Sequence, residues 1–373
     1  MKILFTGGGT GGHIYPIAAI VRELRKKYGA TIHLSYLGPK DNFCNVVLAK
    51  ERVKVNNIVA GKLRRQADPL SLLQNLIDAI IKIPLGVLQS FFWLFFTNPD
   101  LVFSKGGYGS YPVVVSARIL GIPVFLQESD MVAGMASRKT AKYAAGIFVS
   151  FPNTEGFSAR KMILTGNPIR LELAAGSKEE AVRALGLKGG RPVILVIGGS
   201  QGAQRINDKI LDALPELLKT YEIIHIVGPR NADQVVKESK IAARPELLEY
   251  YHSLGYADER TLADIYAAAD LIISRAGSGG IFEIAAAKKP SILIPLPESA
   301  QNHQVKNAYA YAQTGAALVI EEGNFTNHLF LERIHDLISV PQTLAAMAEA
   351  AAQFARPNAG QIIADYIVKY ARK

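Results

Sequence analysis

Cysteine is almost absent from this chain, because Cys44 is the single one among 373 residues. That scarcity excludes a disulfide framework and a cysteine-based zinc site, and it is typical of a reducing compartment. The sequence opens on the apolar segment 2–5 without a basic leader or a cleavage site, so we expect no secretory signal. Hydrophobic residues make up 49% and charged residues 20%, which excludes disorder as the main state, and the length predicts two domains.

Long apolar runs are also missing, since no stretch reaches the roughly 20 uninterrupted apolar residues that a membrane-spanning helix needs. The longest candidate, 83–96, is interrupted by proline, glycine and polar residues. We interpret 87–96 mainly as core, because a strand is predicted directly after it. The amphipathic stretch 70–82 has basic residues nearby, which is typical of a helix that lies on an anionic bilayer. We therefore predict a membrane-facing surface at 70–82.

Acidic residues are scarce in the first half of the chain. Residues 1–168 hold 20 basic and 9 acidic side chains, whereas the remainder holds 22 and 23. A one-sided basic surface attracts polyanions such as nucleic acid, an anionic membrane leaflet or phosphorylated substrates. The net charge of +10 thus belongs to the N-terminal half, and charge alone leaves all three partner classes open.

Short apolar runs alternate with amphipathic stretches, which predicts parallel sheets covered by helices. In the first half we predict strands at 3–5, 31–37, 100–104, 124–127 and 146–150, with a helix at 17–28. After a break at 166–168, where Asn-Pro disfavours helix, we predict strands at 193–197, 223–227, 271–274 and 291–294, with a helix at 207–219. We expect an N-terminal domain over 1–165, a C-terminal domain over 166–358, and a helix in 359–373 that folds back onto the first domain.

The two halves begin alike. Segments 2–13 and 193–204 each consist of an apolar strand, a glycine-rich turn and the start of a helix. We therefore predict an α/β fold of two Rossmann-like, doubly wound parallel-sheet domains that face each other across a cleft.

The glycine-rich turn 7–12 is the strongest local signal. Glycines permit positive φ and let a phosphate or sugar approach bare N–H groups at the start of a helix. The turn lacks the Gly-Lys-Ser/Thr of a P-loop, and its Gly-x-Gly-x-x-Gly match has no acidic residue ending a second strand, so a dinucleotide site is weakly supported. His13 follows the turn and is a candidate general base, because its ordinary pKa lies near working pH; packing or capping is the alternative.

Similar turns follow other predicted strands, at 106–110, 198–202 and 274–280. At the carboxyl ends of parallel strands they would line one site with N–H donors. We expect no metal and no cofactor, because no Asp-x-Asp occurs and the seven histidines show no ligand-like pair. Helix N-termini and cationic side chains would then stabilise the charge of a leaving diphosphate.

Five motifs, in order and with sensible spacing over nearly the whole chain, resemble those of one known family. They are Gly-Gly-Thr-Gly-Gly-His at 8–13, Thr-Gly-Asn-Pro-Ile-Arg at 165–170, Gly-Gly-Ser-Gln-Gly-Ala at 198–203, Ser-Arg-Ala-Gly at 274–277 leading to Glu-Ile-Ala-Ala-Ala at 283–287, and His-Gln-x-x-Asn-Ala at 303–308. Together they resemble the MurG family, peripheral membrane transferases that add N-acetylglucosamine to lipid I to make lipid II for peptidoglycan.

The resemblance implies a GT-B fold and an inverting, metal-independent transfer. It implies UDP-N-acetylglucosamine as donor and an undecaprenyl-diphosphate-linked muramoyl-peptide as acceptor. The protein would lie on the anionic inner leaflet of the cell membrane, peripherally and on the cytoplasmic side. Nucleic acid is not expected as a partner.

The resemblance also implies site residues, matched position by position. Catalysis would involve His13 and Glu128. Donor binding would involve Thr10, Gly11, Gly12, Asp130, Arg170, Ser200, Ala257, Ser278, Gly279, Gly280, Ile281, Phe282, Glu283, Gln304 and Asn307. Acceptor binding would involve Gly9, Gly107, Tyr108, Gly109 and Ser110. Within this set Ser200 would lie near the donor phosphates, Glu283 would accept from ribose hydroxyls, and Gln304 would hold the sugar hydroxyls.

One segment departs from the family, which usually reads His-Glu-Gln-Asn where this chain has Gln-Glu-Ser-Asp at 127–130. Asp130 thus replaces an Asn that contacts the donor. Near a diphosphate its carboxylate would be unfavourable unless protonated or paired. Asp130 as the N-cap of a helix from Met131 onward is the structural alternative.

The mechanism that we expect is direct displacement at the anomeric carbon, with His13 as base and Glu128 or Asp130 in reserve. Alternatives are a related transferase with another acceptor, a UDP-N-acetylglucosamine epimerase, an NAD-dependent oxidoreductase and a non-catalytic scaffold.

Overall fold

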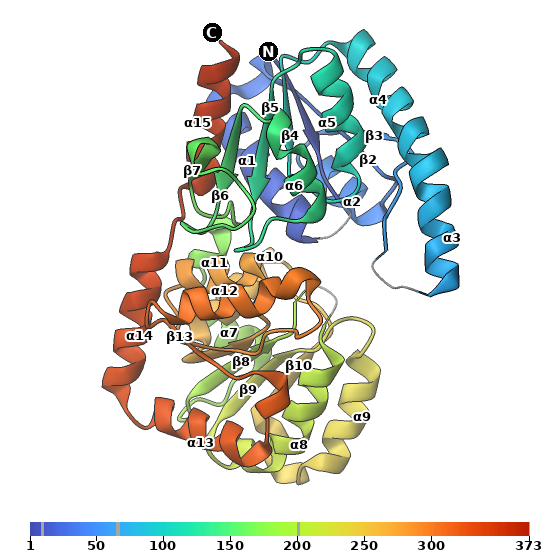
Figure 1. The fold of residues 1–373 in the computed structure, drawn as a ribbon. Coiled ribbons are helices and arrows are strands. Elements are labelled where there is room, and N and C mark those ends of the chain that lie inside the picture. Colours follow the sequence, from blue (N-terminus) through green and yellow to red (C-terminus); the bar gives the residue numbers. More distant parts are fainter. Residues whose placement is uncertain (9–10, 65–67, 200–201, 373) are drawn as a thin grey trace. The chain divides into compact units, whose positions relative to one another are not determined.

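The computed structural model of the chain describes residues 1–8, 11–64, 68–199 and 202–372. The chain divides into two compact units (Figure 1): unit 1 comprises Met1–Ile169 and Pro357–Lys373, and unit 2 comprises Arg170–Arg356. The divisions thus fall at 169/170 and 356/357, whereas the sequence placed them at 165/166 and 358/359.

Unit 1 is built on a seven-stranded sheet with strand order β3-β2-β1-β4-β5-β6-β7, in which all the neighbouring strands are parallel. The strands are β1 (Lys2–Thr6), β2 (His33–Gly38), β3 (Lys54–Asn57), β4 (Leu101–Ser104), β5 (Val124–Glu128), β6 (Gly146–Val149) and β7 (Met162–Leu164). The order reverses between β1 and β4, so the ends of these two strands form the switch point where such sheets bind ligands.

The helices of unit 1 are α1 (Gly11–Tyr28), α2 (Asn42–Lys50), α3 (Pro69–Ile77), α4 (Ile83–Thr97), α5 (Ser110–Ile119), α6 (Met135–Thr140) and α15 (Ala359–Ala371), with short turns η1 (Gly29–Thr31), η2 (Asp78–Lys82), η3 (Ala141–Tyr143) and η4 (Ala159–Lys161). Helix α1 begins at Gly11, six residues before the predicted start. Helix α15 buries Ile363 and Ile367 in the same core cluster as Ile17 of α1.

Unit 2 repeats the plan with a six-stranded sheet of order β10-β9-β8-β11-β12-β13, again parallel throughout. The strands are β8 (Val193–Ile197), β9 (Glu222–Ile226), β10 (Tyr251–Leu254), β11 (Leu271–Ser274), β12 (Ser291–Leu293) and β13 (Ala317–Val319). The helices are α7 (Lys178–Leu185), α8 (Gln204–Thr220), α9 (Ala232–Ala242), α10 (Glu259–Ala268), α11 (Ser278–Ala286), α12 (His303–Ala312), α13 (Asn327–Ile338) and α14 (Pro341–Phe354), with turns η5 (Leu171–Ala174), η6 (Pro245–Tyr250), η7 (Ala300–Asn302) and η8 (Glu322–Asn324).

The nine predicted strands all form, and the sequence missed four others, β3, β7, β10 and β13. Each missed strand is short, lies at a sheet edge and is largely half-buried. Central strands are buried on both faces and read as apolar runs, whereas edge strands lack that signal. The expectation of two doubly wound parallel-sheet domains is confirmed.

Helix α3, the π-helical turn η2 and helix α4 form one continuous helical segment, Pro69–Thr97. By length and composition alone this 29-residue segment could cross a membrane, although, as predicted, it holds no run of about 20 uninterrupted apolar residues. A single helix of this kind is weak evidence for crossing. The wider hydrogen bonding of the π turn accommodates Pro84 at the start of α4, because proline has no N–H to donate.

Helix α4 packs on unit 1 along one narrow face. Gly86, Ser90 and Leu94 are buried at four-residue spacing. A Cβ at Gly86 would lie 2.2 Å from the Val59 carbonyl oxygen, so only glycine allows this approach. The opposite face is open, with Phe96 78% exposed and Phe92 and Phe95 at least half exposed. The prediction that 87–96 is mainly core is therefore wrong.

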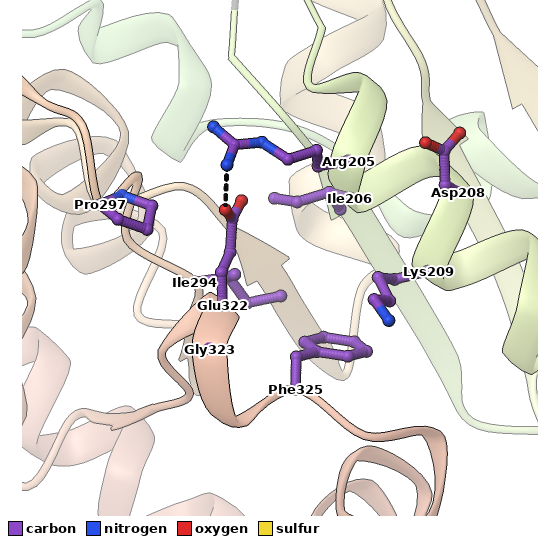
Figure 2. Close-up of a pocket in the computed structure, with 9 residues that line it drawn as sticks. All are labelled: Arg205, Ile206, Asp208, Lys209, Ile294, Pro297, Glu322, Gly323 and Phe325. Atoms are coloured by element: carbon purple, nitrogen blue, oxygen red, sulfur yellow. Dashed lines mark ion pairs between the residues drawn. The ribbon is translucent and has the colours of Figure 1, made fainter.

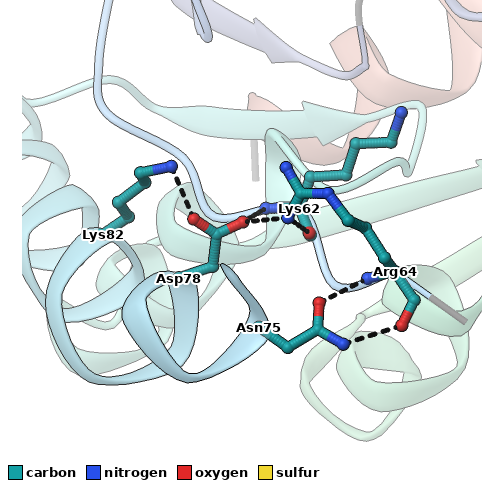
Figure 3. Close-up of polar contacts among 5 residues, drawn as sticks. All are labelled: Lys62, Arg64, Asn75, Asp78 and Lys82. Carbon is teal, nitrogen blue, oxygen red and sulfur yellow. Dashed lines mark hydrogen bonds and ion pairs between the residues drawn. The ribbon is translucent and has the colours of Figure 1, made fainter. Parts of the chain in front are cut away.

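A buried carboxylate joins the apolar helical segment to the preceding loop (Figure 3). Asp78 is 1% exposed and pairs with Lys82 at 2.6 Å and Arg64 at 3.0 Å. It also accepts from the Lys62 backbone N–H at 3.0 Å. Burial raises the pKa of this carboxyl, but the hydrogen bonds from Lys82 and Arg64 outweigh it, so the pKa lies below its ordinary value. The pairing holds a basic loop beside the exposed apolar side chains.

Candidate functional site

The glycine turns of unit 1 meet at the carboxyl edge of its sheet. Strands β1, β4 and β5 are neighbours, so the segments that follow them lie side by side. Gly107 has a φ of 81°, and a Cβ there would come within 2.9 Å of the Gly8 nitrogen. A Cβ at Gly109 would lie 2.6 Å from the Gly7 carbonyl oxygen. Two predicted turns thus touch through their backbones, which explains why both are glycine-rich.

His13 lies in the first turn of α1, beside the β4–α5 turn. A Cβ added at Gly107 would lie 3.1 Å from the Nε2 atom of His13, and a Cβ added at Gly8 would lie 3.2 Å from the Nδ1 atom of His13. Burial lowers the pKa of His13 to about 3, Lys105 lowers it further and Asp130 opposes the effect. The imidazole is therefore neutral at working pH, as a general base must be.

Glu128 ends β5 and is buried. Its Oε1 accepts from the Ser129 N–H at 3.1 Å, and its Oε2 accepts from the Gly134 N–H at 3.0 Å. Burial raises its pKa, Lys105 lowers it and Asp130 raises it. Because both oxygens already hold the loop between β5 and α6, the geometry favours a positioning role over that of a mobile base.

The unusual segment 127–130 is locked to the end of unit 1. The Gln127 amide donates to the Asn167 Oδ1 at 3.3 Å, and the Ser129 hydroxyl donates to the same oxygen at 2.6 Å. Asp130 follows these buried residues and is itself half-buried. Helix α6 begins at Met135 with Gly134 as its N-cap, so the alternative of Asp130 capping a helix from Met131 is wrong.

The remaining predicted residues of unit 1 surround the same turns. Gly9 and Thr10 lie outside the described residues. Gly11 and Gly12 form the N-terminus of α1, where backbone N–H groups lack intrahelical partners. Tyr108 is half-buried, whereas the Ser110 hydroxyl is buried and donates to the Gly107 carbonyl at 2.9 Å.

Lys105 was missed by the sequence reasoning. It follows β4 directly and is 4% exposed, and a Cβ at Gly7 would touch both its Cβ at 3.4 Å and that of His13 at 3.7 Å. Burial lowers its pKa, and Glu128 and Asp130 raise it. The available signal was a lysine directly after an apolar strand and before a glycine turn.

In unit 2 the corresponding edge is formed by β8, β11 and β12, which are neighbours. Helix α11 begins at Ser278 after Gly277. A Cβ on Gly277 or Gly279 would meet nothing within 4 Å, so this N-terminus is open. Helix N-termini attract anions through unpaired N–H groups and the helix dipole. Ser200, predicted near the donor phosphates, lies outside the described residues.

Arg170 and Glu283 form a bidentate ion pair within unit 2. The Arg170 Nε and Nη2 donate to the two Glu283 oxygens at 3.0 and 3.1 Å. Burial raises the pKa of Glu283, while Arg170 lowers it. The structure thus brings together two residues that were predicted to bind the donor substrate. In it their polar side-chain atoms bind each other.

Two other predicted donor residues come from α12. Gln304 Oε1 accepts from the Leu296 N–H at 3.0 Å. Asn307 is fully buried, and its Nδ2 donates to the Ala276 carbonyl at 3.2 Å, which fixes the turn before α11. Gln301 and Asn302, just before α12, adopt left-handed φ values of 61° and 54°. Such strain in non-glycine residues concentrates at functional sites.

Three predicted donor residues have apolar side chains that face the core. Ile281 and Phe282 are buried, and the Phe282 ring lies 5.0 Å from that of Phe354. Ala257 is also buried and precedes the N-cap of α10, Asp258. Any ligand contact from these residues uses their backbone groups. Gly280 lies beside Ser278 and Gly279 in the first turn of α11.

A cavity of about 420 Å³ lies beside the first turns of α8 (Figure 2). It is lined by Arg205, Ile206, Asp208, Lys209, Ile294, Pro297, Glu322, Gly323 and Phe325. Arg205 pairs with Glu322 at 2.8 Å, and Glu322 also pairs with Arg275. This network braces the turn before α11, and the predicted donor residues do not line the cavity. Within the described part of the chain, no group of three or more His, Cys, Asp or Glu could hold a metal.

The fold and the turns define an α/β protein of two doubly wound units, each with anion-attracting helix N-termini at its carboxyl edge. Models of the glycosyltransferase family 28 N-terminal and C-terminal domains match residues 3–149 and 193–362. A Bacillus cereus protein named UDP-N-acetylglucosamine–N-acetylmuramyl-(pentapeptide) pyrophosphoryl-undecaprenol N-acetylglucosamine transferase 2 is 37% identical over 90% of this chain and 91% of its own. A Clostridium kluyveri transferase of the same name, without the number, matches with the same identity and coverage. The chain belongs to glycosyltransferase family 28 and, within it, to the family of these transferases, so the resemblance to MurG is confirmed.

Solved structures agree with this fold. The crystal structure of Acinetobacter baumannii MurG is 27% identical, with a TM-score of 0.75 over 99% of both chains. A UDP-GlcNAc 2-epimerase from Neisseria meningitidis bound to UDP-GlcNAc is 18% identical, with a TM-score of 0.69 over 99% of this chain and 100% of its own. At that identity the epimerase shares the fold alone.

Proposed function

We propose that the chain transfers N-acetylglucosamine from UDP-N-acetylglucosamine to the C4 hydroxyl of the muramoyl residue of lipid I, forming lipid II. The observation that carries the proposal is 37% identity over 90% of the chain to transferases named for this reaction. The two glycine-turn edges, one per unit, support it, because the reaction brings together two substrates that each contain a diphosphate.

In this mechanism His13 is the general base. Its neutral imidazole takes the proton of the acceptor hydroxyl while the hydroxyl oxygen forms a bond to C1 of the sugar. The bond from C1 to the β-phosphate oxygen breaks on the opposite face, UDP leaves with the bonding electrons, and the configuration at C1 inverts. Glu128 positions the loop between β5 and α6, and the turns at 7–12 and 106–110 hold the acceptor through Gly9, Gly107, Tyr108, Gly109 and Ser110.

Unit 2 would hold the donor. The N–H groups at the start of α11, from Ser278 to Gly280, would receive the nucleotide, and Glu283 would accept from ribose hydroxyls. Arg170 would hold the diphosphate, with Ser200 near the phosphates and Gln304 on the sugar hydroxyls. Because Arg170 and Glu283 pair with each other, donor binding would exchange that pair for two ligand contacts.

The segment Pro69–Thr97 would attach the enzyme peripherally to the anionic inner leaflet of the cell membrane. Leu70, Leu72, Leu76 and Ile80 are each more than half exposed. The basic loop at 61–64, held by Asp78 (Figure 3), lies beside them. Apolar side chains with neighbouring cations are what binds a protein to an anionic surface.

A transfer assay tests the proposed reaction. The purified chain, in detergent or liposomes, is given UDP-N-acetylglucosamine labelled in the sugar, with and without lipid I. The proposal expects labelled lipid II and one UDP per product, with UDP release only when lipid I is present. Conversion of the donor to its 2-epimer without acceptor would support the epimerase alternative instead. Transfer to another lipid acceptor, with none to lipid I, would assign a different acceptor.

A further inference from the structure

Lys105 is a largely buried residue whose ammonium has no partner among the residues that the structure describes. Its side chain is 4% exposed, while its backbone N–H joins the ends of β1 and β4 through a 2.8 Å bond to the Thr6 carbonyl. Among the residues that the structure describes, none forms a hydrogen bond or ion pair with the ammonium group. The fully buried side-chain atoms that lack a hydrogen bond do not include its Nζ, so the ammonium end of this otherwise buried side chain keeps some solvent access, where an anion can reach it.

The surroundings of Lys105 are built from positive helix ends. Its Cβ and that of His13 flank the Gly7 Cβ position, so Lys105 lies against the first turn of the 18-residue helix α1. Lys105 is also only five residues before Ser110, where the 10-residue helix α5 begins. The N-termini of α1 and α5 both direct positive potential toward the region around Lys105. This potential disfavours a cation there and favours an anion.

Two carboxylates offset this positive charge only in part. Glu128 and Asp130 act on Lys105 through space. Both oxygens of Glu128 accept backbone N–H groups, so Glu128 cannot turn to pair with the ammonium without breaking those bonds. An incoming anion could bond the ammonium and the helix N–H groups together.

We propose that Lys105 is a substrate-binding residue whose ammonium takes a phosphate oxygen of a substrate diphosphate at the carboxyl edge of the unit 1 sheet. The diphosphate is that of the acceptor, because the donor diphosphate is assigned to unit 2, and the identity of both substrates rests on the proposed function. The negative charge of the bound phosphate would offset the Lys105 charge, which is one cause of the lowered pKa of His13.

A direct binding measurement tests the residue without relying on activity. Inorganic pyrophosphate is titrated by calorimetry into the full chain saturated with UDP, for the wild type, Lys105→Met, Lys105→Arg and Lys139→Met. Lys139 is an exposed lysine of α6 and matches the charge change. We expect Lys105→Met to weaken binding at least tenfold, Lys105→Arg to keep most of it, and Lys139→Met to match the wild type. Circular dichroism checks that each variant is folded.

Two results overturn the proposal. One is a folded Lys105→Met protein that binds pyrophosphate as tightly as the wild type, and the other is a wild type that binds none at millimolar concentration. If Lys105→Met does not fold, Lys105→Gln takes its place with the same expectations.

Steady-state kinetics then tests the assignment to the acceptor. We expect Lys105→Met to raise the KM for lipid I at least tenfold and to leave the KM for UDP-N-acetylglucosamine unchanged; the reverse pattern contradicts the assignment. Unchanged values for both contradict the proposal. If the wild type transfers no sugar, the proposed function fails while the pyrophosphate result still stands.

Discussion

The two units share one scaffold but treat their buried charges differently. In unit 2 the cations near the predicted donor residues are paired: Arg170 binds Glu283 through two hydrogen bonds, and Arg275 pairs with Glu322. In unit 1 the buried Lys105 has no such bond among the described residues. These two arginines of unit 2 are therefore paired without a ligand, whereas Lys105 of unit 1 is not paired within the described residues.

The units also differ in their outer surfaces. Unit 1 carries most of the excess basic charge of the chain, since residues 1–168 hold 20 basic and 9 acidic side chains. It also carries the helical segment Pro69–Thr97. Only 17% of the most apolar 18-residue window of this segment is buried. The two units therefore share the plan of their sheets and differ in the side chains on their surfaces.

The largest expected effect tests whether unit 1 carries the chemistry. His13→Ala removes the base, and we expect kcat to fall roughly 100- to 10,000-fold, the usual scale of general-base loss. The KM for the donor should change little. The measurement is the transfer assay, with the exposed His328→Ala of unit 2 as control. Near-normal turnover of His13→Ala would remove His13 from this role.

The second prediction tests whether only unit 1 meets the membrane. Leu72→Ser, Leu76→Ser and Ile80→Ser combined should reduce partition onto anionic liposomes on the order of 100-fold, because each exposed side chain contributes about 1 kcal/mol on insertion. Cosedimentation at two salt concentrations measures it.

Ile241→Ser is the matched control, since Ile241 of unit 2 is 86% exposed and should not matter. Equal binding by the triple variant and the wild type would refute the assignment of this surface.

The third prediction tests the paired cation of unit 2. Glu283→Gln removes the carboxylate that pairs with the Arg170 charge. It also weakens the hydrogen bonds that residue 283 accepts from the ribose hydroxyls, so we expect UDP to bind roughly 10-fold more weakly. Calorimetry with UDP measures this, and the exposed Glu246→Gln is the control. An unchanged affinity would mean that the ribose contact lies elsewhere.

The last prediction concerns one buried histidine in each unit. Burial lowers the pKa of His13 and of His225 to about 3, below the unfolded value of about 6.5. Between these values the unfolded state binds more protons, so stability is present above pH 6.5 and is lost as the pH falls toward 3. Each histidine should contribute a slope of about 1.4 kcal/mol per pH unit.

Urea unfolding followed by circular dichroism between pH 4 and 7 measures that slope. His225→Gln should flatten the pH dependence by about one proton, even though it also removes the bonds to Tyr251 and Asn207 and lowers stability at every pH. A slope that stays the same in this variant would show that His225 does not titrate in this range.

Periodicity predicted most of the fold. The strands at the centres of both sheets are buried on both faces, so each appears as an apolar run in the sequence. The edge strands β3 and β13 are partly exposed and lack that signal. The exposed face of α4 was misjudged for a related reason: hydrophobicity reports what can be buried, but Phe96 is apolar and 78% exposed.

The sequence by itself determined the two doubly wound units, the glycine turns after their strands, and the family to which the chain belongs, because local periodicity and motif spacing are written along the chain. Tertiary structure alone decided which polar atoms are free. Arg170 and Glu283 are 113 residues apart and pair with each other. Lys105 interacts through space with Glu128 and Asp130 but has no hydrogen bond to its ammonium among the described residues. Pairing depends on distances and burial that only the packed sheets establish.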